Sequence, residues 1–144
     1  MAEITAVCTS KKKGTPKKPI TDGIFVQDFG MQDDAHASSD THRQVSLLAT
    51  ESIAKMRNRG FNVNPGDFAE NLTTEGIELF TLPVGTKMTV GTEVILEISQ
   101  IGKECHTKCA IFHQMGECIM PQEGVFATVI KGGIIRAGDK LAVK

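Results

Sequence analysis

The sequence predicts a single, mainly β domain, folded as a barrel or sandwich with one or two short helices. Three observations indicate this class. The 144 residues are enough for one ordinary domain, and the composition, 40% hydrophobic and 23% charged, is typical of a globular protein. In addition, seven or eight short β-like runs alternate with turn residues. No repeat or linker divides residues 1–144, so we expect one domain.

The N-terminal part predicts two strands joined by a basic loop. Residues 4–10 and 23–29 are rich in β-branched and small apolar side chains, which favours strands. Between them, residues 11–19 hold five lysines, two prolines and a glycine. We expect this loop to lie in solvent, either as a plain connection or as a positive rim that attracts an anionic ligand. Residues 30–41 are rich in turn formers and predict another loop.

A buried strand and the clearest helix come next. Residues 42–48 end in an apolar run that suits a short buried strand. Thr50 can cap a helix over residues 51–59, and Gly60 ends it. Ile53 and Met56 supply the narrow stripe that faces the core.

The second half of the chain predicts further short strands. Turn signals in residues 61–82 separate short apolar stretches. Residues 87–90 and 93–99 predict an antiparallel hairpin whose two-residue turn is Gly91-Thr92. Three β-like runs follow, at residues 125–130, 134–135 and 140–143.

Composition and motifs argue against several classes of function. The net charge is -1 and the chain has no Trp or Tyr, which does not suit a nucleic-acid binder. Neither a GxGxxG nor a GxxxxGK[ST] motif occurs, so a Rossmann dehydrogenase and a P-loop NTPase are unsupported. No run of about 18 apolar residues and no signal-peptide pattern is present, and we expect a cytoplasmic protein without a membrane partner.

The densest reactive cluster surrounds Cys105, just after the predicted strand 93–99. Lys103, His106 and Lys108 lie close to it in the sequence, and positive neighbours favour the thiolate over the thiol. Cys105 is therefore a candidate nucleophile, sulfur carrier or ligand for a soft metal.

Other interpretations of these cysteines stay open. One interpretation is that the cysteines are buried, reduced thiols that pack as small apolar side chains. It applies above all to Cys8 and Cys118. A zinc site formed by Cys105, His106, Cys109 and Cys118 has suitable ligand types, but the paired CxxC spacing of common zinc sites is absent.

A second constellation lies earlier in the chain and contains His36, Arg43, Gln44, Glu70 and Asn71. Histidine, arginine and amide groups are suited to holding an oxyanion or a polar heterocycle. Arg43 can make a forked contact with a phosphate.

Five segments together resemble the MOSC family, named after the C-terminal domain of molybdenum-cofactor sulfurases. Their order and spacing match over nearly the whole chain, and the Cys-rich segment is similar to that of small bacterial stand-alone members. The segments are HRQVSLL (42–48) with Glu51, PGDFAENL (65–72), LPVG (82–85) with Gly91, EISQIGKEC (97–105) and GGIIRAGD (132–139).

The resemblance implies a MOSC-type β-barrel whose characteristic cysteine falls on Cys105. In the family this cysteine is proposed to carry sulfur as a persulfide or to ligate molybdenum, and Cys109 is a further candidate metal ligand. The implied cofactor is the molybdenum cofactor, molybdopterin. Its expected contacts are Arg43, Gln44, Glu70, Asn71, His36 and His106.

The same resemblance implies partners. Sulfurases join this domain to a pyridoxal-phosphate-dependent cysteine desulfurase, which 144 residues cannot also contain. A separate desulfurase or other sulfur donor is therefore expected, with a molybdoenzyme or a cofactor-synthesis protein as acceptor. One departure concerns His36, because related members tend to read Gly-Asp-Ala-His-Ala-Gly, whereas this chain has Asp33 and Ser38 in place of the two glycines.

Whether the protein is an enzyme stays open at this point. Sulfur transfer is one possibility. The alternatives are a component of a molybdenum-dependent reductase acting on N-hydroxylated compounds and a zinc-stabilised adaptor domain.

Overall fold

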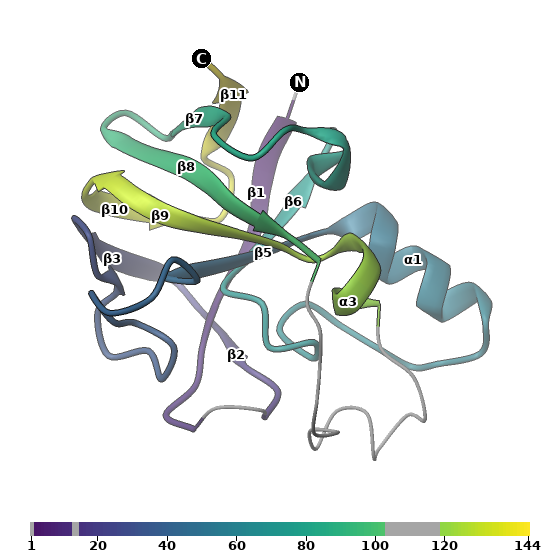
Figure 1. Ribbon diagram of the computed structural model, residues 1–144. Coiled ribbons are helices and arrows are strands. Elements are labelled where there is room, and N and C mark those ends of the chain that lie inside the picture. The colour runs from purple at the N-terminus through teal and green to yellow at the C-terminus, as the bar shows by residue number, and fades with distance from the viewer. Residues whose placement is uncertain (1, 13–14, 103–118) are drawn as a thin grey trace.

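The computed structural model describes residues 2–12, 15–102 and 119–144, and it confirms the predicted mainly β barrel (Figure 1). Seven strands form the barrel in the order β11-β7-β8-β9-β5-β6-β1, and pairing of β1 with β11 closes it. Neighbouring strands are antiparallel except β5 and β6, which are parallel. The strands are β1 (Ala2–Thr9), β5 (Val45–Ala49), β6 (Leu72–Glu75), β7 (Lys87–Val90), β8 (Val94–Ile101), β9 (Val125–Lys131) and β11 (Lys140–Val143).

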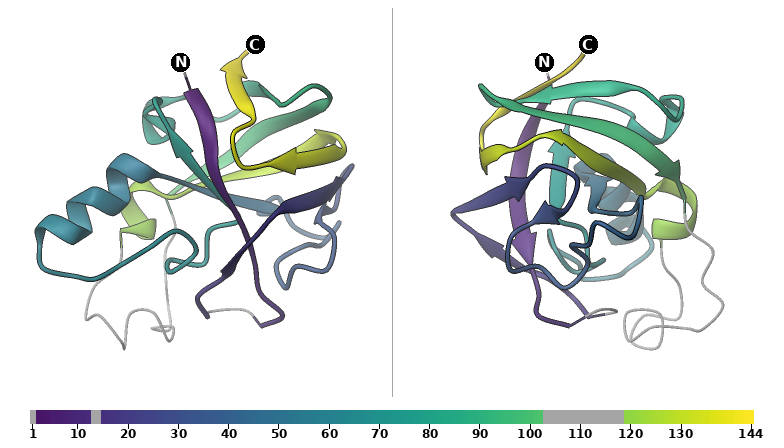
Figure 2. Two further views of the ribbon diagram at one scale, coloured as in Figure 1. Left: turned by 180° about the vertical axis from the view of Figure 1, so that it is seen from behind. Right: turned by 60° about the vertical axis from the view of Figure 1, so that its left-hand side comes forward.

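Smaller elements surround the barrel. Strand β2 (Lys18–Ile20) pairs with β1 beyond the closed part, and β3 (Asp22–Val26), β4 (Gly30–Met31) and β10 (Gly133–Arg136) form a three-stranded sheet. Helix α1 (Thr50–Asn58) connects the parallel strands β5 and β6, and the short helix α3 (Met120–Glu123) precedes β9. A 3-10 turn, η1 (Leu79–Thr81), follows β6. Figure 2 shows α1 projecting from one side of the barrel, with α3 beneath its N-terminal half.

Two hydrophobic clusters stabilise this arrangement. The larger fills the barrel with alternate side chains of its strands, as the period of two in β8 requires. The smaller lies between α1, α3 and the barrel wall and includes Ile53 and Met56, which confirms the predicted core-facing stripe. Within the described ranges, no helix is long and apolar enough to cross a membrane.

Two local predictions were wrong in detail. Thr50 is the first residue of α1 and makes no capping bond; instead its hydroxyl lies 3.1 Å from that of Thr5. The β7–β8 hairpin pairs Val90 with Val94, so its turn has three residues rather than two. Gly91 has a φ of +65° in this turn, a conformation that suits glycine.

The prediction that residues 11–19 lie in solvent was wrong at Lys17. This residue is 2% exposed, and β2 begins directly after it. The lysine count and the prolines gave no indication of burial, because the carboxylate that stabilises Lys17 in the interior lies elsewhere in the chain.

Replacing Leu47 by Ala should destabilise the barrel. Leu47 is fully buried in β5, between Leu72 and Val125 on the two neighbouring strands, so the change leaves a cavity. We expect a loss of about 2 to 5 kcal/mol in the free energy of unfolding, measured by urea denaturation. Val84→Ala, at a position 60% exposed, is the control and should cost less than about 0.5 kcal/mol. Equal losses in the two variants would contradict the assignment of Leu47 to the core.

Candidate functional site

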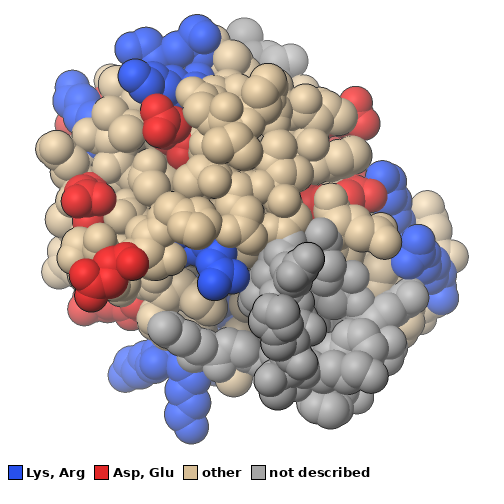
Figure 3. All heavy atoms as spheres, viewed as in Figure 1, with Lys and Arg blue, Asp and Glu red and all other residues tan. Residues whose placement is uncertain are grey.

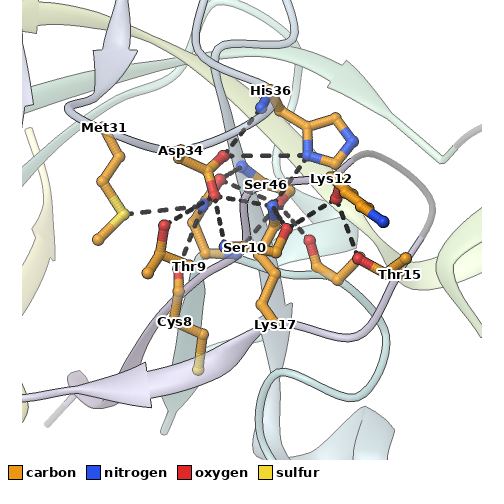
Figure 4. A network of polar contacts seen from close by, with 12 residues as sticks. Cys8, Thr9, Ser10, Lys12, Thr15, Lys17, Met31, Asp34, His36 and Ser46 are labelled. Atoms are coloured by element: carbon orange, nitrogen blue, oxygen red, sulfur yellow. Dashed lines mark hydrogen bonds and ion pairs between the residues drawn. The ribbon is translucent and has the colours of Figure 1, made fainter.

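The end of β1, residues 61–71 and helix α3 lie on one side of the barrel, the lower side in Figure 1. Two candidate residues, Glu70 and Asn71, belong to the second of these segments. The site is built around a set of polar groups that we call the Asp34 network: Thr9, Ser10, Lys17, Asp34 and His36, which are labelled in Figure 4, together with Asn71.

Asp34 is the centre of this network, and its side chain is fully buried. One carboxylate oxygen, Oδ1, accepts hydrogen bonds from the Thr9 hydroxyl (3.1 Å), the Ser10 N–H (3.2 Å) and the Lys17 ammonium (2.8 Å). The other, Oδ2, accepts the backbone N–H of His36 at 3.1 Å. Burial raises the pKa of Asp34, but the hydrogen bond and charge of Lys17 outweigh it, so the pKa lies below its ordinary value.

Lys17 is the buried cation of the network. Its Nζ lies 2.8 Å from Asp34 Oδ1, 3.0 Å from Ser10 Oγ and 2.9 Å from His36 Nδ1. Its backbone N–H donates to the carbonyl of Gly66 at 2.6 Å. Gly66 has a φ of +91°, and a Cβ there would collide with the Lys17 carbonyl, so only glycine allows the two segments to approach this closely.

Glu70 is fully buried beneath this contact, and it binds groups of the fold itself. Its carboxylate accepts the N–H of Gly66 (2.9 Å), the N–H of Phe68 (3.2 Å) and the hydroxyl of Thr73 (3.0 Å). Burial raises the pKa of Glu70 to about 7, although these donors favour the ionised form. Glu70 therefore stabilises the turn at Gly66, whose carbonyl accepts the hydrogen bond from the Lys17 backbone.

Asn71 links the network to the centre of the barrel. Its side-chain oxygen accepts the Ser46 N–H at 3.0 Å, and its amide group donates to the Cys8 carbonyl at 3.2 Å. Its side chain is also among the groups that lower the pKa of Asp34. Asn71 therefore connects β1, β5 and the start of β6.

Gln44 is buried as well, and both ends of its amide are used. The NH₂ group donates to Asp28 Oδ1 at 3.0 Å, and the oxygen accepts the Val129 N–H at 3.1 Å. Like Glu70 and Asn71, Gln44 was predicted to contact a cofactor. In this structure the three side chains position backbone around the site.

Arg43 and His42 are exposed and lie beside the end of β8. The Arg43 guanidinium lies 5.9 Å from the centroid of the Phe126 ring, a cation–π arrangement. His42 Nε2 lies 2.6 Å from the Gln100 side-chain oxygen, and the Gln100 amide donates to the Gly102 carbonyl at 2.8 Å. These contacts place Arg43 next to the point where the chain leaves β8.

Cys105, His106, Cys109 and Cys118 lie outside the described residues, so their predicted roles stay predictions. The described ends of that segment are anchored: the Gly102 N–H donates to the Gly124 carbonyl at 2.7 Å, and Glu123 of α3 accepts hydrogen bonds from Ser52 and Lys55 of α1. In the ranges 2–12, 15–102 and 119–144, no three His, Cys, Asp or Glu side chains are grouped so that they could hold a metal ion.

Sequence reasoning missed Lys17 and Asp34. Lys17 is one of five lysines in a run that was expected in solvent, and nothing local separates it from Lys18. Asp34 follows the exposed Asp33 in a polar loop. Only the three-dimensional pairing of the two charges reveals them.

Charged side chains of both signs are spread over the described part of the face in Figure 3, without a large area of one sign. This agrees with the net charge of -1. The anion-binding rim suggested for residues 11–19 stays a prediction for the exposed Lys11, Lys12 and Lys18, whereas Lys17 is buried.

Comparisons with known proteins identify the fold. The model of the MOSC domain family matches residues 32–142. The YUAD protein from Bacillus subtilis matches with a TM-score of 0.80 at 15% identity, covering 99% of this chain and 96% of that one. YiiM from Geobacillus stearothermophilus matches with a TM-score of 0.77 at 21% identity, covering 100% of this chain and 75% of that one. YiiM from Escherichia coli matches with a TM-score of 0.68 at 17% identity, covering 100% of this chain and 70% of that one. A search of curated proteins found no match.

Replacing Glu70 by Gln should change how stability depends on pH. Folding raises the pKa of Glu70 from 4.5 to about 7, so the folded state binds this proton more tightly than the unfolded state does. The stabilising contribution is complete below about pH 4.5 and is lost as the pH rises through 7. The unfolding free energy of the wild type, relative to that of the variant, should fall by on the order of 3 kcal/mol across this window, measured by urea denaturation.

Glu78→Gln, at an exposed position, is the matched control for this comparison. The assignment fails if the difference between wild type and Glu70→Gln stays constant with pH.

Proposed function

This chain belongs to the MOSC domain family, and from that membership we propose that it is a cofactor-associated module whose Cys105 carries sulfur as a persulfide or ligates molybdenum. The family is associated with the molybdenum cofactor.

The observation that carries the proposal is a continuous path of contacts from the Asp34 network to the stem of the Cys105 segment. Asn71 binds Ser46, and Ser46 pairs with Phe126 across the β5–β9 ladder. Phe126 pairs in turn with Gln100, whose amide binds Gly102. The chain therefore leaves β8 beside His42 and Arg43, and Arg43 is one of the polar groups that suit an anionic cofactor.

The described donors fit the anionic part of molybdopterin. Arg43 is exposed, and its guanidinium can make a forked contact with a phosphate while its face packs over Phe126. His36 is partly exposed beside Lys17, and both belong to the Asp34 network. The role of Gln44, Glu70 and Asn71 would be indirect, since their hydrogen bonds hold the backbone around the site in place. His106 remains a candidate contact on sequence grounds alone.

Cys105 supplies the reactive sulfur in this proposal. Its neighbours Lys103, His106 and Lys108 favour a thiolate. That thiolate attacks the outer sulfur of a persulfide on a donor protein; the new S–S bond forms on Cys105, and the donor departs as its own thiolate. Pyridoxal phosphate would belong to the donor desulfurase, and a molybdoenzyme or cofactor-synthesis protein would be the acceptor. When bound, the molybdenum cofactor supplies a metal centre that takes up soft sulfur ligands.

Replacing Cys105 by Ala should abolish sulfur loading. After incubation with a cysteine desulfurase, cysteine and pyridoxal phosphate, the wild type should gain about 32 Da by intact mass, or carry molybdenum by elemental analysis after exposure to the cofactor. Cys8→Ala is the matched control, because Cys8 is fully buried and burial raises the pKa of its thiol to about 12. It should load like the wild type.

Two results would contradict this role. One is equal sulfur and molybdenum content in wild type and Cys105→Ala. The other is zinc near one equivalent with unfolding on chelation, which would support a zinc-stabilised adaptor instead.

Replacing Arg43 by Lys should weaken cofactor binding while the charge is kept. A lysine cannot form the forked contact with phosphate, so we expect the Kd for molybdopterin to rise about tenfold, measured by absorbance titration. Arg136→Lys is the control, since Arg136 lies on β10 in a surface ion pair with Asp22. Loss of the same size in both variants would argue against an Arg43 contact.

A further inference from the structure

The small sheet of β3, β4 and β10 turns an apolar face to solvent. On its inner side, Phe25 and Ile135 are buried in the core of the barrel. Because side chains alternate across a strand, Ile24 and Ile134 point the opposite way, and they are 49% and 38% exposed. The two are direct partners across the β3–β10 ladder, so their side chains are neighbours.

Val26 and Phe29 extend this surface. Val26 lies on the same side of β3 as Ile24, and its carbonyl accepts the Phe29 N–H at 3.1 Å. Both side chains are more than a third exposed. Single apolar side chains are ordinary on a surface, but a group of them on one small sheet is typical of a surface that another molecule covers. We call Ile24, Val26, Phe29 and Ile134 the outer apolar face; its sheet lies at the left of the barrel in Figure 1.

The free edge of β10 is closed to strand pairing. The N–H of Ile134 donates to the Glu93 carboxylate at 3.3 Å, and the N–H of Arg136 donates to the Asp139 carboxylate at 2.8 Å. These two side chains occupy backbone donors that an added strand would need. A partner of this sheet must therefore pack on its face and not along this edge.

A pair of charges at one end of the sheet indicates what the partner is. Asp22 and Arg136 are direct partners across the β3–β10 ladder, and Arg136 Nε lies 3.5 Å from Asp22 Oδ2. Both side chains are about half exposed. Each lies two residues from an isoleucine of the outer apolar face, so it points to the same side of the sheet. A surface that ends in one negative and one positive charge, side by side, can be complementary to itself.

We propose that the outer apolar face binds a second copy of this chain about a two-fold axis that runs parallel to the strands, midway between β3 and β10. Rotation about that axis places Asp22 of each copy over Arg136 of the other, and Ile24 over Ile134. Each charge then has two opposite charges as neighbours, while like charges lie on the diagonals. Dimerisation through this face does not depend on the function proposed for Cys105.

The small size of the sheet predicts a weak dimer. A stable interface buries roughly 800 Å² of each partner, and three short strands supply only the centre of such an area. We therefore expect a Kd on the order of 10 to 100 μM. Sedimentation velocity over a concentration series up to about 1 mM should show the monomer–dimer equilibrium. A monomer throughout the series overturns the proposal, whatever other molecule covers this face.

Replacing Ile24 by Lys should raise the Kd of the dimer at least about tenfold, because the change buries a charge against an apolar side chain of the second copy. Val143→Lys is the matched control, since Val143 is an apolar residue of β11 that is 46% exposed outside the outer apolar face. It should leave the Kd unchanged. No effect of Ile24→Lys, or an equal effect of the control, would place the contact elsewhere and overturn the proposal.

Charge reversal tests the two-fold arrangement itself. Asp22→Arg leaves two positive charges at this end of each copy, and Arg136→Asp leaves two negative ones. Each variant alone should therefore dimerise at least about tenfold more weakly than the wild type. An equal mixture of the two variants should form a heterodimer with a Kd within about threefold of the wild-type value, because every positive charge then faces a negative one.

Native mass spectrometry distinguishes this heterodimer from the two homodimers, since the variants differ in mass. A mixture that dimerises no better than the separate variants overturns the proposed pairing of Asp22 with Arg136.

Discussion

The buried negative charge of Asp34 is the constraint on which this side of the molecule depends. A carboxylate removed from water is costly unless its oxygens are fully hydrogen-bonded, and Asp34 meets this requirement with donors from the end of β1, from Lys17 and from its own loop. Asn71, which precedes β6, also favours the ionised form of Asp34. Segments far apart in the sequence are therefore held at one point. The backbone positions of His36 and Gly66 follow from that pairing.

The two buried carboxyl groups in this region illustrate how partners decide charge. Asp34 contacts an ammonium, and its pKa is lowered despite burial. Glu70 contacts backbone N–H groups and a hydroxyl, which are neutral donors, and burial raises its pKa to about 7. Glu70 therefore responds to pH near neutrality while Asp34 stays ionised. The difference arises because, among the residues that the structure describes, a compensating full charge lies within hydrogen-bond distance of Asp34 but not of Glu70.

The sequence predicted most strands and helix α1, because alternation and turn residues act locally. Prediction from the sequence failed where the burial of a residue depends on a partner that is distant in the sequence. Lys17 resembles its neighbours in composition, and its burial depends on Asp34. Family motifs led to Glu70, Asn71 and Gln44 as contacts of a cofactor, but a motif does not show whether a side chain binds the fold or a ligand. In the structure all three side chains hydrogen-bond groups of the fold, and their predicted contacts with a cofactor stay predictions. Arg43 stays exposed, and the roles of Cys105, His106 and Cys109 stay predictions.

Closure of the barrel has a practical consequence for engineering. Ala2 pairs with Leu141, so the first and last strands bring the two chain ends side by side (Figures 1 and 2). The Asp34 network contacts the opposite end of β1, which has 8 residues and is about 26 Å long at the rise of a β-strand. A fluorescent reporter or surface tether attached at either end would therefore be held well away from Arg43 and His36. A short peptide joining the two ends would permit circular permutation with new openings chosen in exposed turns.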